Sequence, residues 1–273
     1  MKTNQNNLQK HEDNSFTLKI TLAQKDISDE YQNILKSLQS NYKSKGFREG
    51  KVPMDIIEKD ISQEKIVSEI LSHLVGHAYE DVIKENNLKP IIQPQIKINN
   101  PPLTFNKDWE VELISSELPS IKLDEKYQTE IKKFNKSKEA ESQKRESKLN
   151  KILEIIVNSS TVEMSPMLME AEIERKMSQL IDQLNQAKLT VNQYLQNKGQ
   201  TLDQYKEELK KQSLEEWKIN LSVDRIAKDQ KIEIKPEEAQ KYLEKNPQLS
   251  QNVNLMYYIL IQEKVFEYLL GLK

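Results

Sequence analysis

The sequence has no cysteine, and only 5 glycines and 3 histidines among its 273 residues. Without cysteine, disulfide bonds, thiolate catalysis and cysteine-ligated zinc are all excluded. The scattered glycines form neither a GxGxxG motif nor a Walker-type phosphate loop. His11 lies in a polar N-terminal stretch, and no serine has the surroundings of a nucleophile elbow. We therefore expect no enzymatic activity and no cofactor.

His73 and His77 have the i, i+4 spacing of a helical metal pair. The residues between them are "LVG", so the glutamate of an HExxH motif is missing. Acidic residues lie nearby, but they are common on any solvated helix face. We expect an ordinary polar face here and no metal site.

The chain also lacks a long apolar run and an excess of charge of either sign. Its 41 basic and 43 acidic residues give a net charge of −2, so an anionic partner would have to be bound by a local patch. The most apolar stretch, residues 255–272, is interrupted by Glu263, Lys264 and Glu267, and the N-terminus has no apolar core of a secretory signal. These features predict a soluble, cytoplasmic protein that does not associate with membranes.

The first part of the sequence mixes the periods of strands and helices. Residues 1–13 have the composition of a disordered tail, and apolar residues alternate from Phe16 to Leu22 as in a half-buried strand. Spacings of three and four then predict helices near 26–45, 53–59 and 66–83, and extended segments follow near 91–98 and 103–115. We expect a small α+β domain in which long helices cover one face of an antiparallel sheet.

The second part begins with a basic stretch, residues 132–151, that is almost devoid of apolar residues. Helical patterns continue from there to the end, with cap signals at Ser165-Pro166, Thr190, Gly199 and Thr201. We expect roughly five to seven helices and no convincing sheet in this half.

The segment "GFREGKVP", residues 46–53, contains two of the five glycines. One interpretation is a tight connection between helices, with Gly46 ending one helix, Gly50 in a turn and Pro53 opening the next. That interpretation leaves Phe47 and Arg48 unexplained. The second interpretation is a docking point, because an aromatic ring can fill a pocket while a guanidinium binds phosphate or carboxylate.

"GFREGKVP" followed by "MDIIEK" resembles the ribosome-docking loop of the trigger factor family of bacterial chaperones. The resemblance extends over nearly the whole chain. "NNLKPIIQPQIKI" and "LTFNKDWEVELISSELPSIKL" are similar to the end of that family's N-terminal domain, and "EMSPMLMEAEIERKMSQL", the segment from "LTVNQYLQNKGQ" to "AQKYL", and "VFEYLL" are similar to its helical C-terminal domain.

The resemblance places the docking contacts on Phe47 and Arg48, framed by Gly46, Gly50 and Pro53. Basic charge would come from Lys51, with Lys43 and Lys45 as auxiliary residues. Glu49 stands where some relatives carry lysine, which removes one positive charge from the tip.

Four methionines, Met164, Met167, Met169 and Met177, gather around the first long helix of the second half. Methionine adapts to varied partners, so these side chains are candidate contacts for unfolded clients. Ordinary packing between helices explains them equally well.

The family usually carries an FKBP-like prolyl isomerase domain between its N-terminal domain and its helices. Here about 20 basic and polar residues stand in that place, too few for a sheet-based domain. We therefore predict no isomerase activity. The expected organisation is a disordered tail (1–13), a ribosome-binding domain (14–118), an extended linker (119–137) and an elongated, mainly α-helical, SurA-like chaperone domain with arms (138–273).

The resemblance implies an ATP-independent chaperone involved in protein folding and, by family association, in protein transport and cell division. Its partners would be the large ribosomal subunit (protein and rRNA at the exit tunnel), unfolded nascent polypeptides and, away from the ribosome, a second copy in a weak homodimer. Two alternatives stay open. One is a ribosome-independent cytosolic holdase; the other is a structural adaptor whose basic residues 132–151 bind an acidic or RNA partner.

Overall fold

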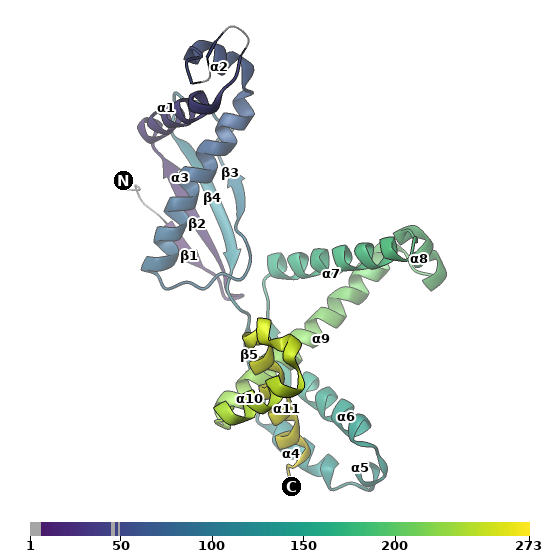
Figure 1. The fold of residues 1–273 in the computed structure, drawn as a ribbon. Coiled ribbons are helices and arrows are strands. Elements are labelled where there is room, and N and C mark those ends of the chain that lie inside the picture. The colour runs from purple at the N-terminus through teal and green to yellow at the C-terminus, as the bar shows by residue number, and fades with distance from the viewer. Residues whose placement is uncertain (1–6, 45–46, 49) are drawn as a thin grey trace. The chain divides into compact units, whose positions relative to one another are not determined.

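The computed structural model describes residues 7–44, 47–48 and 50–273 (Figure 1). It divides the chain into two compact units, Met1–Leu118 and Pro119–Lys273, called unit 1 and unit 2 below. Each has its own hydrophobic core.

Unit 1 contains a four-stranded antiparallel sheet with the strand order β1-β2-β4-β3. Its elements, in chain order, are β1 (Asn7–Lys10), β2 (Ser15–Leu22), α1 (Gln24–Asn41), α2 (Met54–Asp60), α3 (Gln63–Glu85), β3 (Gln95–Ile98) and β4 (Trp109–Ser116). The central pairing of β2 with β4 sets Leu18 opposite Leu113 and Ile20 opposite Val111.

One face of this sheet is apolar and is covered by the helices. Leu18, Ile20 and Leu113 are buried there together with Ile70 of α3 and Leu35 of α1. Burying each such side chain contributes about 1.5–3 kcal/mol relative to leaving it in water. Lys19 and Thr21 are exposed and alternate with buried Leu18, Ile20 and Leu22, which matches the period of two in the sequence, whereas Thr17 is buried.

The prediction of a disordered tail over residues 1–13 is wrong for residues 7–13. Asn7–Lys10 forms β1, which pairs antiparallel with β2 and sets Leu8 opposite Leu18. Leu8 is the only apolar residue in this strand, so no alternation was visible in the sequence. Backbone pairing with an existing strand edge holds β1 in place.

Unit 2 is mainly helical, as the sequence predicts. Its elements are β5 (Ser120–Leu123), α4 (Lys126–Asn135), α5 (Lys138–Ser142), α6 (Arg145–Asn158), β6 (Ser160–Glu163), α7 (Pro166–Gln186), α8 (Val191–Lys198), α9 (Leu202–Asp229), α10 (Pro236–Lys245), the 3-10 helix η1 (Pro247–Gln251) and α11 (Val253–Leu270). The largest core of the unit joins α4, α6, α9 and α11.

Two further expectations are corrected in unit 2. Residues 119–137 are not an extended linker, because most of them form β5 and α4. Tyr127, Ile131 and Phe134 of α4 are buried in the core; their i, i+4, i+7 spacing is helical but is hidden among lysines. A small sheet also exists, since β5 pairs antiparallel with β6. Both of these strands have only four residues, too short to show a reliable period.

None of the helices in the described ranges combines the length and the apolar character needed to cross a membrane.

Candidate functional site

The loop between α1 and α2 is fastened firmly at its C-terminal end. Val52 is fully buried in the core of unit 1, and its carbonyl accepts a hydrogen bond of 2.7 Å from the side-chain amide of Gln39 on α1. The Lys51 amide donates to the Arg48 carbonyl at 2.9 Å, which closes a turn. Gly50 has φ +77°, a conformation that is costly for any residue with a side chain.

The tip of this loop presents an aromatic ring and positive charge to solvent. The Phe47 side chain is 43% exposed, and Arg48 and Lys51 are exposed as well. Among the acidic side chains that the structure describes, none lies within ion-pair distance of Arg48. In this arrangement the Phe47 ring can enter a partner's pocket, while the Arg48 guanidinium donates two hydrogen bonds to a phosphate or carboxylate.

The other residues predicted for the docking site flank this tip. Lys43 is exposed just beyond the end of α1, and Pro53 caps the N-terminus of α2. The predicted contributions of Lys45, Gly46 and Glu49 lie outside the described residues. The structure therefore brings Phe47, Arg48, Gly50, Lys51 and Pro53 together in one braced loop, with Lys43 at its start.

Helix α2, which follows the loop, is held to α1 through tyrosine hydroxyls. Tyr31 donates to Glu58 at 2.8 Å, and Tyr42 donates to Asp60 at 2.9 Å. Burial, together with the hydrogen bond to Glu58, raises the pKa of Tyr31 to about 12, so the phenol stays protonated as a donor. These bonds hold α2, and with it the C-terminal end of the loop, against α1 and the residue that follows it.

His73, the first residue of the histidine pair, contacts a glutamate of α1. His73 Nδ1 lies 2.7 Å from Glu30 Oε1 on α1, and His77 is exposed. Among the described residues, no group of three or more histidine, aspartate or glutamate side chains is placed to hold a metal ion.

In unit 2, α7, α8 and the first half of α9 form an arm with a small core of its own. Leu195, Tyr205 and Leu209 are buried in it, and Ile173 and Met177 of α7 pack against them. Capping boxes at Thr190–Gln193 and Thr201–Gln204 begin α8 and α9, and Gly199 ends α8 with φ +66°. The cap signals predicted at these positions are thus observed, and they set the sharp reversal of the arm.

The bend of the arm is reinforced by two tyrosines that meet edge to face and by a lysine. The rings of Tyr194 and Tyr205 meet edge to face at 5.9 Å, and Lys198 Nζ lies 5.0 Å from the centre of the Tyr205 ring. Burial, with a smaller contribution from Tyr194, raises the pKa of Tyr205 to about 12. The phenol therefore stays neutral at any physiological pH, as an aromatic packing group should.

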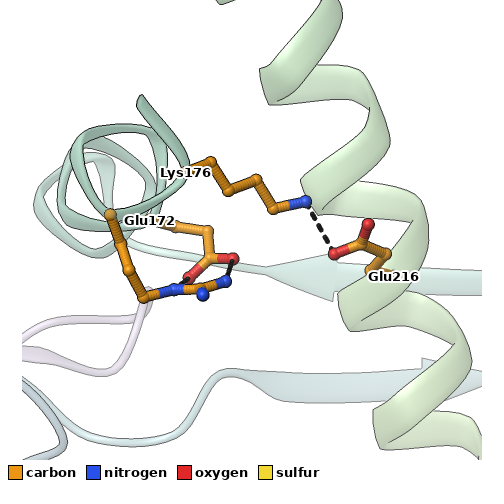
Figure 2. Close-up of polar contacts among 4 residues, drawn as sticks. Glu172, Lys176 and Glu216 are labelled. Carbon is orange, nitrogen blue, oxygen red and sulfur yellow. Dashed lines mark hydrogen bonds and ion pairs between the residues drawn. The ribbon is translucent and has the colours of Figure 1, made fainter. Parts of the chain in front are cut away.

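An ion pair joins the two long helices of the arm (Figure 2). Lys176 on α7 donates to Glu216 on α9 at 2.7 Å, and the Lys176 side chain is only 14% exposed. Next to it, Glu172 accepts two hydrogen bonds from Arg175 of the same helix, at 3.1 and 2.6 Å. Only the first of these contacts fixes the spacing between α7 and α9.

The four predicted methionines do not form one cluster. Met177 lines a groove of about 570 Å³ with Ile173 and Leu202. Met164 precedes α7, and Met167 and Met169 lie in its first turns. Ten residues of helix, about 15 Å, separate Met167 from Met177. All four side chains are half-buried.

The sequence analysis missed the most exposed apolar residues of the arm. Ile181 is 41% exposed, Leu189 is 39% exposed and Leu202 is 42% exposed. Leu202 lies at the start of α9 and lines the same groove as Met177. One signal in the sequence could have identified Ile181. It directly follows Leu180, which packs against the core, so the apolar stripe of α7 is wider than one buried face requires.

The basic segment 132–151 does not form a continuous charged strip. It spans the end of α4, α5 and the first half of α6, and it contributes Phe134 and Ala140 to the main core of unit 2. Arg145 pairs with Glu267 of α11, and Lys151 pairs with Glu154 at 2.8 Å. Part of its positive charge is therefore neutralised within the unit.

Comparison with known proteins relates both parts of the chain to one family. The family model for "Bacterial trigger factor protein (TF)" matches residues 1–152, and the model for the trigger factor C-terminus matches residues 123–270. The two matches overlap, so no unmatched segment lies between them.

Individual relatives agree with the family models. The chain is 30% identical over 127 residues to trigger factor of Staphylococcus carnosus, which covers 46% of this chain and 28% of that protein. It is 29% identical over 112 residues to trigger factor of Streptococcus pneumoniae, with 41% and 26% covered. The match thus spans less than a third of these relatives' length.

A solved structure that concerns promiscuous substrate recognition in folding and assembly by the trigger factor chaperone has the same fold. The TM-score is 0.69 at 12% identity, and the match covers 98% of this chain and 100% of the other. The family resemblance seen in the sequence is confirmed by the two family models. On the strength of both family models, this chain belongs to the bacterial trigger factor family.

Proposed function

We propose that this chain is an ATP-independent chaperone that docks on the large ribosomal subunit near the nascent-chain exit and shields emerging polypeptides. The observation that carries the docking part is the pairing of a 43% exposed Phe47 with an exposed Arg48 on a loop braced by Val52. A phenyl ring that is held exposed at the tip of the loop does not gain the free energy of burial within unit 1. That free energy is gained when a partner covers the ring.

The arm of unit 2 is the proposed surface for unfolded segments. Its exposed apolar side chains, Ile181, Leu189 and Leu202, are spread over three places rather than concentrated in one pocket. Such a surface binds many sequences weakly, and half-buried Met177 beside it adapts to different side chains. Release then needs no nucleotide, because a client that folds buries the segments the arm was binding.

We further propose that the chain has no prolyl isomerase activity. Only residues 117–119 separate β4 of unit 1 from β5 of unit 2, and the matches to the two family models overlap. Neither the three-residue connection nor the overlap of the two matches leaves room for an inserted sheet-based domain.

The docking proposal is tested by co-sedimentation with vacant ribosomes over a salt series. Phe47→Ala/Arg48→Ala is expected to weaken binding at least tenfold, and wild-type affinity is expected to fall with salt because part of it is electrostatic. The matched control is Ile91→Ala/Lys89→Ala, which removes another exposed apolar and basic pair from unit 1. Equal loss in both double variants, or none in either, would reject the loop as the anchor.

The shielding proposal is tested separately, by suppression of aggregation of a diluted, denatured client protein. Ile181→Ser/Leu202→Ser is expected to reduce suppression severalfold and to leave ribosome binding unchanged. Val253→Ser/Leu255→Ser, equally exposed but on α11, serves as the control. A chain that suppresses aggregation without binding ribosomes would be a ribosome-independent holdase.

A further inference from the structure

Strand β3 forms an open edge of the sheet in unit 1, and all four of its residues are exposed. Ile96 is 50% exposed and Ile98 is 36% exposed. The register pairs these residues with Leu113 and Val111 of β4, which are buried on the helix-covered face. The apolar face of the sheet therefore continues past the helices and ends in two uncovered isoleucines.

The backbone of the same two residues points away from the sheet. The Asn99 amide donates to the Glu110 carbonyl at 2.9 Å, so this pair is hydrogen-bonded. Hydrogen-bonded and non-hydrogen-bonded residue pairs alternate along an antiparallel ladder. The backbone N–H and C=O groups of Lys97 and Gln95 therefore also point toward β4. Ile96 and Ile98, which alternate with these residues, then direct their N–H and C=O groups outward, toward the open edge of the sheet.

A groove lies at the Ile98 end of this edge, on the apolar face. It has a volume of about 510 Å³ and is lined by the start of α3, including Val67, and by Ile98, Pro102 and Leu103. A strand added beside β3 would direct alternate side chains toward this groove. Binding of a peptide as an added strand requires two features, outward-facing backbone groups and a pocket for its side chains. The backbone hydrogen bonds give affinity, and the pocket gives specificity.

The charges on the polar face of the sheet indicate which charge a strand beside β3 would need. Lys19 of β2 lies opposite Glu112 of β4, and Glu112 lies opposite Lys97 of β3. Charge thus alternates across the sheet and ends on an exposed lysine at the edge. An acidic residue on the next strand would continue the alternation, whereas a second lysine would be repelled.

We propose that the β3 edge binds an extended polypeptide segment of the pattern apolar–acidic–apolar as an additional strand. The two apolar side chains would cover Ile96 and Ile98, and the acidic one would face Lys97. Pro94 and Pro101 bracket the strand, so the site accepts only a short segment. That the segment comes from an unfolded client rests on the proposed chaperone function; the site would be a second one, separate from the arm.

The experiment uses the full chain carrying Ile181→Ser/Leu202→Ser, so that binding to the arm contributes little. Fluorescence anisotropy follows a fluorescein-labelled peptide, Ser-Thr-Val-Glu-Val-Thr-Ser, and a second peptide with lysine in place of glutamate. Ile98→Pro removes an outward N–H without breaking the bonds to β4, and is expected to weaken binding of the glutamate peptide at least fivefold. Ile91→Ala, comparably exposed but outside β3, is the control.

Charge reversal provides a test that a general loss of structure cannot imitate. Lys97→Glu is expected to reverse the preference, so that the lysine peptide binds up to about fivefold tighter than the glutamate peptide. Hydrogen exchange should show new protection at the amides of Ile96 and Ile98 when peptide is bound, while those of Gln95 and Lys97 are protected beforehand.

Three results would overturn the proposal: peptide binding unaffected by Ile98→Pro, an unchanged charge preference in Lys97→Glu, or a dimer dispersed by Ile98→Pro in a chain that binds no peptide. The last would assign the edge to a second copy. Ribosome co-sedimentation and aggregation suppression, measured on Ile98→Pro in the otherwise wild-type chain, report on the proposed function independently of this edge.

Discussion

The loop tip of unit 1 and the arm of unit 2 both expose apolar side chains, but they do so in opposite ways. In the loop, one ring, Phe47, sits on a backbone fixed by buried Val52 and by the bond from Gln39. In the arm, Ile181, Leu189 and Leu202 are distributed over separate helices and turns.

This difference separates a surface for one partner from a surface for many. A single aromatic with an adjacent guanidinium on a fixed backbone is specific, because both groups must meet matching features at once. Dispersed apolar residues beside an adaptable methionine do not require a partner with matching features. The proposed function therefore gives unit 1 the constant partner and unit 2 the variable partners.

The largest expected effect tests whether the two units are energetically separate. Ile152→Ala removes a fully buried side chain from the core of unit 2 and should cost that unit about 2–5 kcal/mol. In a Trp217→Phe background the only remaining tryptophan is Trp109, which is buried in unit 1. Fluorescence-detected denaturation should then show an unchanged midpoint for Ile152→Ala and a lowered midpoint for Ile20→Ala. A common shift would show that the units unfold together.

An intermediate effect is expected at the two glycines with left-handed backbone. Gly50→Ala and Gly199→Ala each force a side chain into positive φ, at a cost of about 1–2 kcal/mol. The first should weaken ribosome co-sedimentation up to about tenfold, and the second should leave it unchanged while loosening the arm. Gly76→Ala, on α3 with open space around the new methyl group, should instead stabilise unit 1 by about 1 kcal/mol. Ribosome binding lost equally in Gly50→Ala and Gly199→Ala would contradict the assignment.

The smallest expected effect concerns the pairing of the arm helices. Glu216→Gln removes the partner of Lys176, whose side chain is largely buried, and should destabilise the arm by about 0.5–1 kcal/mol. Arg175→Gln loses mainly the hydrogen bonds to Glu172 within α7, with a weaker electrostatic attraction to Glu216, and should change the spacing of α7 and α9 less. Hydrogen exchange of α7 would distinguish the two variants; equal deprotection would contradict a specific role for the interhelical pair.

Much of the fold could be predicted because its apolar periods are strong. The alternation in β2, the stripes of α1 and α3, and the cap signals at Thr190, Gly199 and Thr201 all correspond to observed elements. β1, α4 and β5 were not predicted because they are short or sparsely apolar. β1 is held by backbone pairing with the adjacent β2, whereas α4 and β5 are held by neighbours distant in sequence. Local patterns do not contain that information.

The candidate sites were predictable to different degrees. Glycines and proline around an aromatic identify the loop directly, since each restricts the backbone in a known way. The exposed residues of the arm could not be separated from core residues by sequence, because half-buried Met177 and exposed Leu202 belong to equally apolar stretches. The open edge at β3 depends on strand order, which no local pattern specifies.

The most direct test of the central claim is site-specific photo-crosslinking on ribosomes that carry a stalled nascent chain. A photoreactive phenylalanine analogue would replace Phe47 in one variant and Leu202 in another. The account predicts that the probe at Phe47 crosslinks to components of the large subunit and the probe at Leu202 to the nascent chain. Crosslinks from both positions to the same partner, or from Leu202 to the ribosome alone, would contradict it.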